Sequence, residues 1–482
     1  MDPAPGGQAD LISVLPEDLL LEILERLGSA RAAAGTSLLS RRWRGLWTRL
    51  PSLTLSFHDL PFGSIEAALH RAAARRRPGV YIYHLNIRVA GEAGTMGAGR
   101  FSSLLWDAAR LSPVELLLTL PRNLEVSCME VTLPSFHRAT SMDLRARELH
   151  LTVWAKPYGS LNGYYVPFRS LERLSLSGCH IDLATFIPFC QRLRVLRLNT
   201  TGLVDMSNIT VHSASLEELV VEHGNRWTGR TRTHISVDSP VLKQLTASFH
   251  ACGNIGVSIL APMLDKVWWR CSYAKPIYGL GLWGLSEVGF NTNAGRGACV
   301  QLPSVHVLSL HISPVQDSVS FPNAELSFEA EIDKHMVTNF SGLDLHLSTK
   351  GHVFGAFVLH LLGMHRIRTA LRNLKIVLLR SEVKDACPVN CLCDEPKNWR
   401  TETITLADLE TMEIEGVGGE DHEFDFLEVI FRCAPMLKTV TVRLSDGVTP
   451  SVDWCTKVNN ISMAYPSVEC NADLVSRAKA VC

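Results

Sequence analysis

Three cysteines stand close together in the segment CPVNCLC, at Cys387, Cys391 and Cys393. Thiolates are preferred ligands of zinc, and structural zinc sites usually combine two pairs of closely spaced ligands. His422 and Cys433 follow downstream, but they are not spaced as a second pair. Because only half of the pattern is present, we predict reduced thiols with a structural role and no bound metal.

Three glycines, Gly279, Gly281 and Gly284, match the spacing of the dinucleotide-binding fingerprint. That fingerprint must follow a strand, open a helix and be answered by an acidic residue about twenty positions later. Here the next segment, LSEVGF, has the pattern of a strand, and no acidic residue stands near position 304. We therefore predict a turn at these glycines and no nucleotide site.

Other catalytic signatures are absent from the sequence. It contains no P-loop, no nucleophile-elbow serine and no HExxH helix, and its 18 histidines show no ligand spacing. We predict a protein that is not an enzyme and has no cofactor. A hydrolase or oxidoreductase in an α/β fold is the alternative, which an ordered ligand in a pocket lined by acid and base residues would favour.

The composition is that of a folded chain without a strong overall charge. The 482 residues suffice for two or three domains or for one repeat array; 46% are hydrophobic and 20% charged. A formal net charge of −1 provides no basic field to hold a nucleic acid or an anionic membrane. The run Arg75-Arg76-Arg77 is expected in a solvated loop rather than as a nuclear address. The longest apolar stretch, from about Val353 to Met364, is too short to span a membrane.

The cellular compartment follows from two further observations. The first ten residues have neither a basic nor an apolar segment, so we expect no secretory signal. The 13 cysteines are odd in number and scattered, which favours reduced thiols over a disulfide scaffold. We expect a cytoplasmic or nuclear protein.

Residues 10–51 have the pattern of three short helices. Pro16 suits the first position of a helix, and Glu17 and Asp18 favour the helix dipole. Gly28 would cap the first helix, Gly35 interrupts an alanine-rich second one, and a third begins near Ser37. The apolar stripes consist of Leu19, Leu20, Ile23, Leu24 and Leu27 on the first helix and Leu39, Trp43, Leu46 and Trp47 on the third.

A unit of this size cannot bury all of that apolar surface within itself. It either docks a partner or caps the elements that follow it, and the residue pattern leaves both possibilities open.

The combination of LPEDLLLEILERL with TSLLSRRWRGLW resembles the F-box of plant F-box proteins, in particular the FBD/leucine-rich-repeat group of grasses. The resemblance implies docking to a Skp-type adaptor and, through it, to a cullin–RING ligase. The adaptor contacts that it implies are Leu15, Pro16, Leu19, Ile23, Leu38, Leu39, Trp43 and Trp47. The family usually has an acidic residue in place of Ala32 and a long polar one in place of Gly35. Since glycine inside a helix costs about 1 kcal/mol relative to alanine, we expect a looser second helix.

A repeated pattern, L-x-x-L-x-L with substitutions, fills the middle of the chain. Clear copies start at Leu171, Leu193, Leu216 and Leu242, and weaker ones at Leu264, Leu285 and Val305. Steps of about 20 to 26 residues are typical of leucine-rich repeats. Stacked copies would form a curved parallel sheet with the leucines inward. An unrelated α/β domain with parallel strands is the alternative.

The polar positions of these strands would share the concave face. We predict that a protein target binds there, through Arg173, Arg197, Glu218, Glu222, Lys266, Trp268 and Arg270. Lys266, Trp268 and Arg270 form a row, because strand positions two apart share a face.

Residues 387–444 resemble the FBD region of plant F-box proteins, on the segments CPVNCLC and LETMEIEGVGGEDHEFDFLEVIFRCAPMLKTVTV. We predict a strand at Leu409–Ile414, a helix at about Asp421–Cys433 and a strand at Leu437–Leu444, and expect this unit to close the repeat array.

The predicted fold is α/β: a three-helix F-box followed by a leucine-rich-repeat solenoid with a curved parallel sheet, closed by an FBD region. The predicted domains are the F-box (10–51), a connecting segment with the first irregular repeats (52–110), the solenoid (111–375), the FBD region (380–445) and a C-terminal tail (446–482).

The predicted function is the substrate-recognition subunit of a Skp–cullin–F-box ubiquitin ligase. Its partners would be the adaptor and an unknown protein substrate, with no nucleic acid and no membrane. The alternative is a leucine-rich-repeat interaction scaffold that works independently of a ligase.

Overall fold

The computed structural model describes residues 15–27, 30–44, 46, 50, 53–74, 82–89, 97–121, 129–153, 168–200, 208–223, 233–251, 255–274, 277–293, 305–315, 324–380, 387, 391–446 and 448–473. The chain divides into two compact units. The first consists mainly of residues 1–206, and the second mainly of residues 241–482.

The first unit begins with short helices, α2 (Glu17–Arg26), α3 (Ala30–Gly35) and the 3₁₀ helix η1 (Thr36–Leu38). Helix α2 confirms the predicted first helix, but it begins one residue later than expected, with Pro16 as the N-cap and Glu17 as the first helical residue. For the predicted third helix, the described residues show turns at residues 39 and 41–44 and a 3₁₀ conformation at Leu46, while residues 45 and 47–49 lie outside them, so this helix is not confirmed. Helices this short depend on packing for their stability, and Leu38 and Leu39 in this segment are largely exposed. Gly28 and Trp47 lie outside the described residues.

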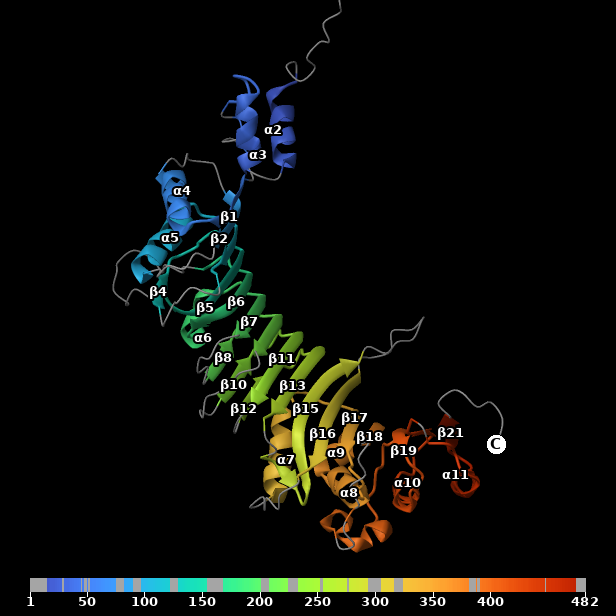
Figure 1. Cartoon of the computed structure of the whole chain (residues 1–482). Coiled ribbons are helices and arrows are strands. Elements are labelled where there is room, and N and C mark those ends of the chain that lie inside the picture. The colour runs from blue at the N-terminus through green and yellow to red at the C-terminus, as the bar shows by residue number, and fades with distance from the viewer. Residues whose placement is uncertain are drawn as a thin grey trace, which may run out of the picture. The chain divides into compact units, whose positions relative to one another are not determined.

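A parallel sheet forms most of the first unit (Figure 1). Its strands are paired in the order β1, β2, β3, β5, β6, β7, β9, and β4 pairs with the second half of β5. The strand bounds are β1 (Leu53–Leu60), β2 (Ile82–Val89), β3 (Glu115–Thr119), β4 (Met129–Leu133), β5 (Ser141–Val153), β6 (Arg173–Ile181), β7 (Val195–Thr200) and β9 (Glu218–His223). The helices are α4 (Phe62–Ala74), α5 (Ala98–Arg110), α6 (Leu183–Phe186) and η3 (Ile187–Phe189). Strand β8 (Asn208–His212) lies at the boundary between the units.

The repeated leucines are stacked in register through this sheet. Leu174 pairs with Leu196, and Leu196 pairs with Leu219, so the three form one ladder. All three are buried. This confirms parallel strands with inward leucines for the copies that start at Leu171, Leu193 and Leu216.

The second unit also contains a largely parallel sheet, ordered β11, β13, β15, β16, β17, β18, β19, β20, β21. The strand bounds are β11 (Gln244–Ala251), β13 (Lys266–Tyr273), β14 (Gly279–Leu280), β15 (Trp283–Asn293), β16 (Val305–Pro314), β17 (Gly342–Ser348), β18 (Asn373–Leu379), β19 (Thr411–Val417), β20 (Thr439–Leu444) and β21 (Glu469–Asp473). Strands β10 (Thr233–Asp238) and β12 (Ile255–Leu260) belong to a small separate sheet. The helices are α7 (Ala324–His335), α8 (Gly355–Gly363), α9 (His365–Ala370), η4 (Leu392–Asp394), η5 (Lys397–Thr401), α10 (Asp421–Cys433) and α11 (Val452–Ala464).

The direction of strand β15 differs from the direction predicted for that repeat. The copy at Leu285 was expected to be parallel to its neighbours, but β15 is antiparallel to both β13 and β16. A parallel strand requires a long crossover, whereas the chain returns from β13 through the short hairpin of β14 and β15. Gly279 pairs with Gly284 across that hairpin, and Gly281 has a φ of 59°. The predicted turn at these glycines is confirmed.

The C-terminal elements agree with the sequence up to β20 and then differ from it. Helix α10 has the predicted bounds, and a capping box of Glu420 and Glu423 begins it. Residues 446–482 were expected to form a tail. Instead α11 and β21 follow, and β21 pairs in parallel with β20, so the unit that ends at Leu444 does not close the sheet.

Candidate functional site

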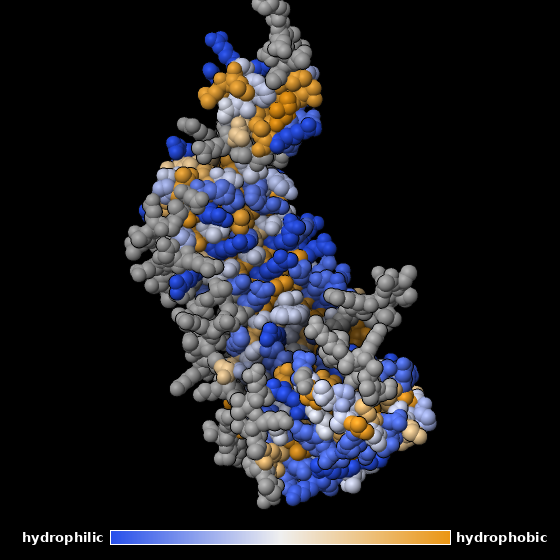
Figure 2. Space-filling model, turned by 45° about the vertical axis from the view of Figure 1, so that its right-hand side comes forward, coloured by the Kyte–Doolittle hydropathy of each residue, from blue (hydrophilic) through white to orange (hydrophobic). Residues whose placement is uncertain are grey.

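Helix α2 and the segment after α3 expose an unusual amount of apolar surface. Leu19 is 43% exposed and Ile23 39%, and Leu38 and Leu39 are exposed by 91% and 71%. Figure 2 shows hydrophobic surface gathered on these N-terminal helices. We call Leu19, Ile23, Leu27, Leu38 and Leu39 the apolar patch; all five are exposed.

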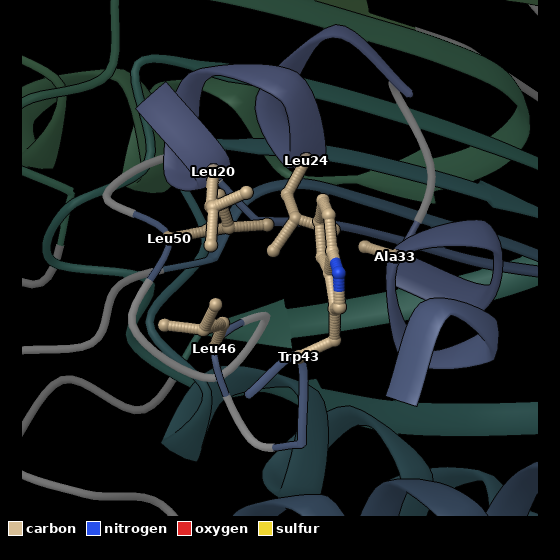
Figure 3. Packing of buried hydrophobic residues seen from close by; sticks show 6 residues of the cluster. All are labelled: Leu20, Leu24, Ala33, Trp43, Leu46 and Leu50. Carbon is tan, nitrogen blue, oxygen red and sulfur yellow. The ribbon is translucent and has the colours of Figure 1, made fainter. Parts of the chain in front are cut away.

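The adjacent face of α2 packs into the core of the same module. Leu20 and Leu24 are buried with Ala33, Trp43 and other apolar residues (Figure 3). The core cluster consists of Leu20, Leu24, Ala33, Trp43, Leu46 and Leu50. Helix α2 is therefore apolar on two adjacent faces, and only one of them packs into the core of the module.

The predicted adaptor contacts are thus distributed unequally. Leu19, Ile23, Leu38 and Leu39 are in the apolar patch, and Pro16 is exposed beside it. Leu15 is partly buried against the core, and its carbonyl accepts a hydrogen bond from Arg42. Trp43 is only 7% exposed, so its ring supports the module from within.

The predicted target-binding residues of the first unit are strand residues held by ion pairs or hydrogen bonds; Arg173, Arg197 and Glu222 are exposed, and Glu218 is half-buried. Arg173 lies 3.6 Å from Glu115, and Arg197 forms an ion pair of 2.9 Å with Glu218. Glu222 accepts a hydrogen bond of 3.4 Å from Asn199. The contacts of Arg197 and Asn199 link the neighbouring strands β7 and β9, whereas Arg173 on β6 reaches Glu115 on β3 across the intervening strand β5.

In the second unit, the predicted row of Lys266, Trp268 and Arg270 is exposed along β13. Trp268 is 45% exposed, while the alternate residues Val267 and Trp269 are buried. The side chains of β13 therefore alternate between exposed and buried along this row, as expected for a strand with one covered face.

Charged and aromatic residues extend that row over the following strands. Arg270 forms an ion pair of 2.8 Å with Glu287 on β15, and the rings of His311 and His346 stack at 4.3 Å. Burial lowers the pKa of both histidines. Lys375 on β18 lies 2.9 Å from Glu415 on β19. We call the exposed residues of β13 with these neighbours the charged face: Lys266, Trp268, Arg270, Glu287, His311, His346, Lys375 and Glu415.

The later members of the charged face, from Glu287 onward, were not among the predicted target-binding residues. They lie in copies of the repeat that depart from the consensus, such as LDLHLS and LRNLKIVLL. The signal that could have found them is the alternation of polar and apolar residues within each copy.

Side chains of the second unit also bring four metal-ligating atoms together. Nδ1 of His352 lies 3.3 Å from Sγ of Cys387 and 3.3 Å from Sγ of Cys391. Sγ of Cys387 lies 3.4 Å from Sγ of Cys393, and all four ligand atoms lie within 4.8 Å of one another. Burial raises the pKa of the Cys387 and Cys393 thiols.

The expectation of metal-free thiols assumed that no fourth ligand was present. His352 provides that ligand, so this premise is wrong. The downstream residues considered with the thiols lie elsewhere: His422 packs against Phe354, and Cys433 lies 3.9 Å from the carbonyl of Glu402. His352 was missed because it comes from a distant part of the chain.

A buried polar network joins α7 to β13. Trp269 donates a hydrogen bond of 2.9 Å to Nδ1 of His335, and the Tyr273 hydroxyl donates one of 2.7 Å to Glu331. His335 Nε2 lies 2.9 Å from the same hydroxyl, and Glu331 and His335 are fully buried. Burial acts to raise the pKa of Glu331, but hydrogen bonds from His335, Lys334 and Tyr273 outweigh it, and the pKa is lowered. This network fastens a helix to the sheet.

Within the described residues, no helix combines the length and apolar character that a membrane crossing requires.

Comparison with known proteins identifies the N-terminal module. A family model described as the F-box domain matches residues 12–55. The match includes the apolar patch and the core cluster beneath it.

Curated relatives match larger parts of the chain. An F-box/FBD/LRR-repeat protein of Arabidopsis thaliana is 26% identical over 323 residues, which cover 64% of this chain and 65% of the relative. A putative FBD-associated F-box protein of the same plant is 24% identical over 242 residues, 49% of each chain. A putative F-box/FBD/LRR-repeat protein of Arabidopsis thaliana is 54% identical over 48 residues, 10% of this chain and 11% of the relative. This chain thus spans between about half and two thirds of the first two relatives.

Proposed function

Because the chain belongs to the plant F-box/FBD/leucine-rich-repeat family, we propose that it is the substrate-recognition subunit of a Skp–cullin–F-box ubiquitin ligase. F-box proteins are generally adaptors of such ligases. In this proposal the chain has no catalytic role: it brings a protein target to the ligase in the cytoplasm or nucleus, and raised effective concentration accelerates transfer.

The observation that carries the proposal is the apolar patch. Leu38 and Leu39 are among the most exposed large hydrophobic residues described in the chain. An apolar surface of this kind on a small helical module is typical of a docking site. Leu19 and Ile23 would contact the Skp-type adaptor from α2, and Leu38 and Leu39 from the segment after α3. Pro16 would lie at the edge, with Leu15 and Trp43 beneath. Trp47 completes the proposed contacts on the family resemblance alone.

The repeat array would hold the target. In this proposal each leucine-bearing strand belongs to one unit of a leucine-rich-repeat solenoid, and residues 380–445 contribute β19 and β20 as its FBD region. The face that carries Arg173, Arg197, Glu218 and Glu222 and the charged face are the proposed target surfaces. An exposed tryptophan between two cations, as at Trp268, is a frequent anchor in protein interfaces.

The experiment is capture of a purified Skp-type adaptor by the full chain. Replacing Leu38→Asp and Leu39→Asp together should weaken capture by at least about tenfold, which corresponds to about 1.4 kcal/mol. Met463→Asp is the matched control, since Met463 is 72% exposed on α11, outside the module. If the folded double variant still captures the adaptor at full strength, the proposal is wrong. A ligase-independent scaffold would then be favoured.

A further inference from the structure

The cluster of His352, Cys387, Cys391 and Cys393 has the dimensions of a single-metal site. With Zn–S bonds of about 2.3 Å and Zn–N bonds of about 2.0 Å, tetrahedral zinc separates two sulfurs by about 3.8 Å and a sulfur from a nitrogen by about 3.5 Å. The observed separations of 3.3 to 3.4 Å for three of the pairs, with every pair within 4.8 Å, are close to these values. One ion therefore fits among the four atoms.

The ligand set is chemically suited to zinc. Three thiolates and one imidazole form a closed tetrahedral set, which is typical of structural rather than catalytic zinc. Oxygen ligands, which magnesium and calcium prefer, are absent from this group of four. The Cys393 side chain is 2% exposed, so water has little access on that side.

A tight turn presents the histidine to the thiols. The backbone N–H of His352 donates a hydrogen bond of 2.8 Å to the carbonyl of Thr349. Between them, Lys350 and Gly351 have φ angles of 46° and 83°. Two successive positive φ angles define a type I′ turn, and a lysine adopts this conformation only at a cost. Such strain persists where the surrounding structure requires the geometry.

The segment that carries Cys391 and Cys393 is held at its C-terminal end by Asp394, which follows Cys393. Its Oδ1 accepts hydrogen bonds from Trp399 Nε1 at 2.8 Å and from Arg400 Nη1 at 2.9 Å. Arg400 also donates to Asp425 of α10 at 2.7 Å. Both sides of the cluster are thus held in place by separate elements.

We infer that His352, Cys387, Cys391 and Cys393 bind one structural zinc ion, which links the turn between β17 and α8 to Cys387, Cys391 and the helix η4 that carries Cys393. Binding replaces the thiol protons with the metal, and these protons pass to the solvent. This inference is independent of the proposed ligase function, since the cluster and the apolar patch lie in different units.

The test is elemental analysis of the full chain, expressed without a histidine tag and purified without chelator. We expect about one zinc per chain, and on replacement by cobalt the absorption bands of thiolate-bound, tetrahedral cobalt. Cys391→Ser and His352→Asn should each reduce the zinc content by more than half. The matched controls, Cys455→Ser on α11 and His365→Asn on α9, should retain it.

A variant that does not fold would leave its metal content uninformative, so the unmodified chain is also treated with a chelator. Removal of zinc should lower the melting temperature by at least about 5 °C, and added zinc should restore it. The inference is overturned if the unmodified chain holds less than about a tenth of a zinc and gives no cobalt bands. Iron in place of zinc, or a mapped disulfide between Cys387 and Cys393, would also overturn it.

Discussion

The ring of Trp399 occupies the space that a side chain on Gly355 would need. A Cβ added to Gly355 would lie 2.4 Å from Cη2 of the ring, and Trp399 is fully buried. Gly355 begins α8 and Trp399 belongs to η5, so this contact sets how closely the two elements pack.

Gly355→Ala is therefore expected to destabilise the protein. Alanine favours a helix over glycine by about 1 kcal/mol, but overpacking a filled core typically costs about 1–3 kcal/mol. We expect net destabilisation, measured as a lower melting temperature. Gly363→Ala in the same helix is the matched control, because nothing lies within 4 Å of its added Cβ. Equal melting temperatures for the two variants would contradict the assigned packing.

The network between α7 and β13 predicts the effect of losing one hydroxyl. Tyr273→Phe removes the donor to Glu331 and leaves a buried carboxylate with fewer partners. Loss of a hydrogen bond to a buried charged group typically costs about 1–3 kcal/mol. Chemical denaturation should show this loss. Tyr83→Phe is the control, since Tyr83 is 48% exposed. A similar loss of stability in that variant would show that burial of the hydroxyl does not cause the effect.

His180 predicts a dependence of stability on pH. Burial, together with the adjacent His150, lowers the pKa of His180 to about 4. Since the unfolded chain binds this proton below about pH 6.5, the folded state is stabilised above that pH. The stabilisation is lost as the pH falls from about 6.5 to about 4.

Replacing His180→Gln should accordingly flatten the fall of melting temperature across that interval. His58→Gln, on an exposed part of β1, is the control and should follow the unmodified chain. An unchanged slope in the His180 variant would count against the pKa shift.

The proposed target surface predicts a selective loss of binding. Lys266→Glu and Arg270→Glu combined with Trp268→Ala should abolish co-purification of the target, while adaptor capture persists. The anchor and both cations of the row are removed, which are the contacts expected to dominate. Met436→Ala with Lys438→Glu is a matched control on exposed residues outside the row. Retention of the target by a folded triple variant would move the target site away from β13.

Local patterns predicted much of this fold. The leucines at Leu174, Leu196 and Leu219 could be placed because alternation within a strand is visible in a few residues. Helix α10 was predicted at its observed bounds because its apolar face and acidic first turn are also local signals. Ser451, whose side chain caps α11, was a signal of the same kind that went unused.

Relationships between distant residues could not be predicted in this way. The alternation within the copy at Leu285 does not show whether β15 runs with its neighbours or against them, because the direction depends on the short connection from β13 and not on the strand itself. His352 approaches Cys387 only after the chain has formed α8, α9 and β18 between them. The apolar face of α2 likewise gave no sign of which of its leucines would be buried and which exposed.

The reversed strand β15 restricts how this array can change in length. Where neighbouring strands are parallel, one strand with its crossover can be duplicated or deleted and every later strand keeps its direction. At β13, β15 and β16 the direction changes twice, so deletion of β15 alone would place β13 and β16, which run in the same direction, next to each other and would require a long crossover between them. Strands at this point can be gained or lost only in pairs, and the interior of the second unit therefore divides the array into two stretches that can lengthen independently.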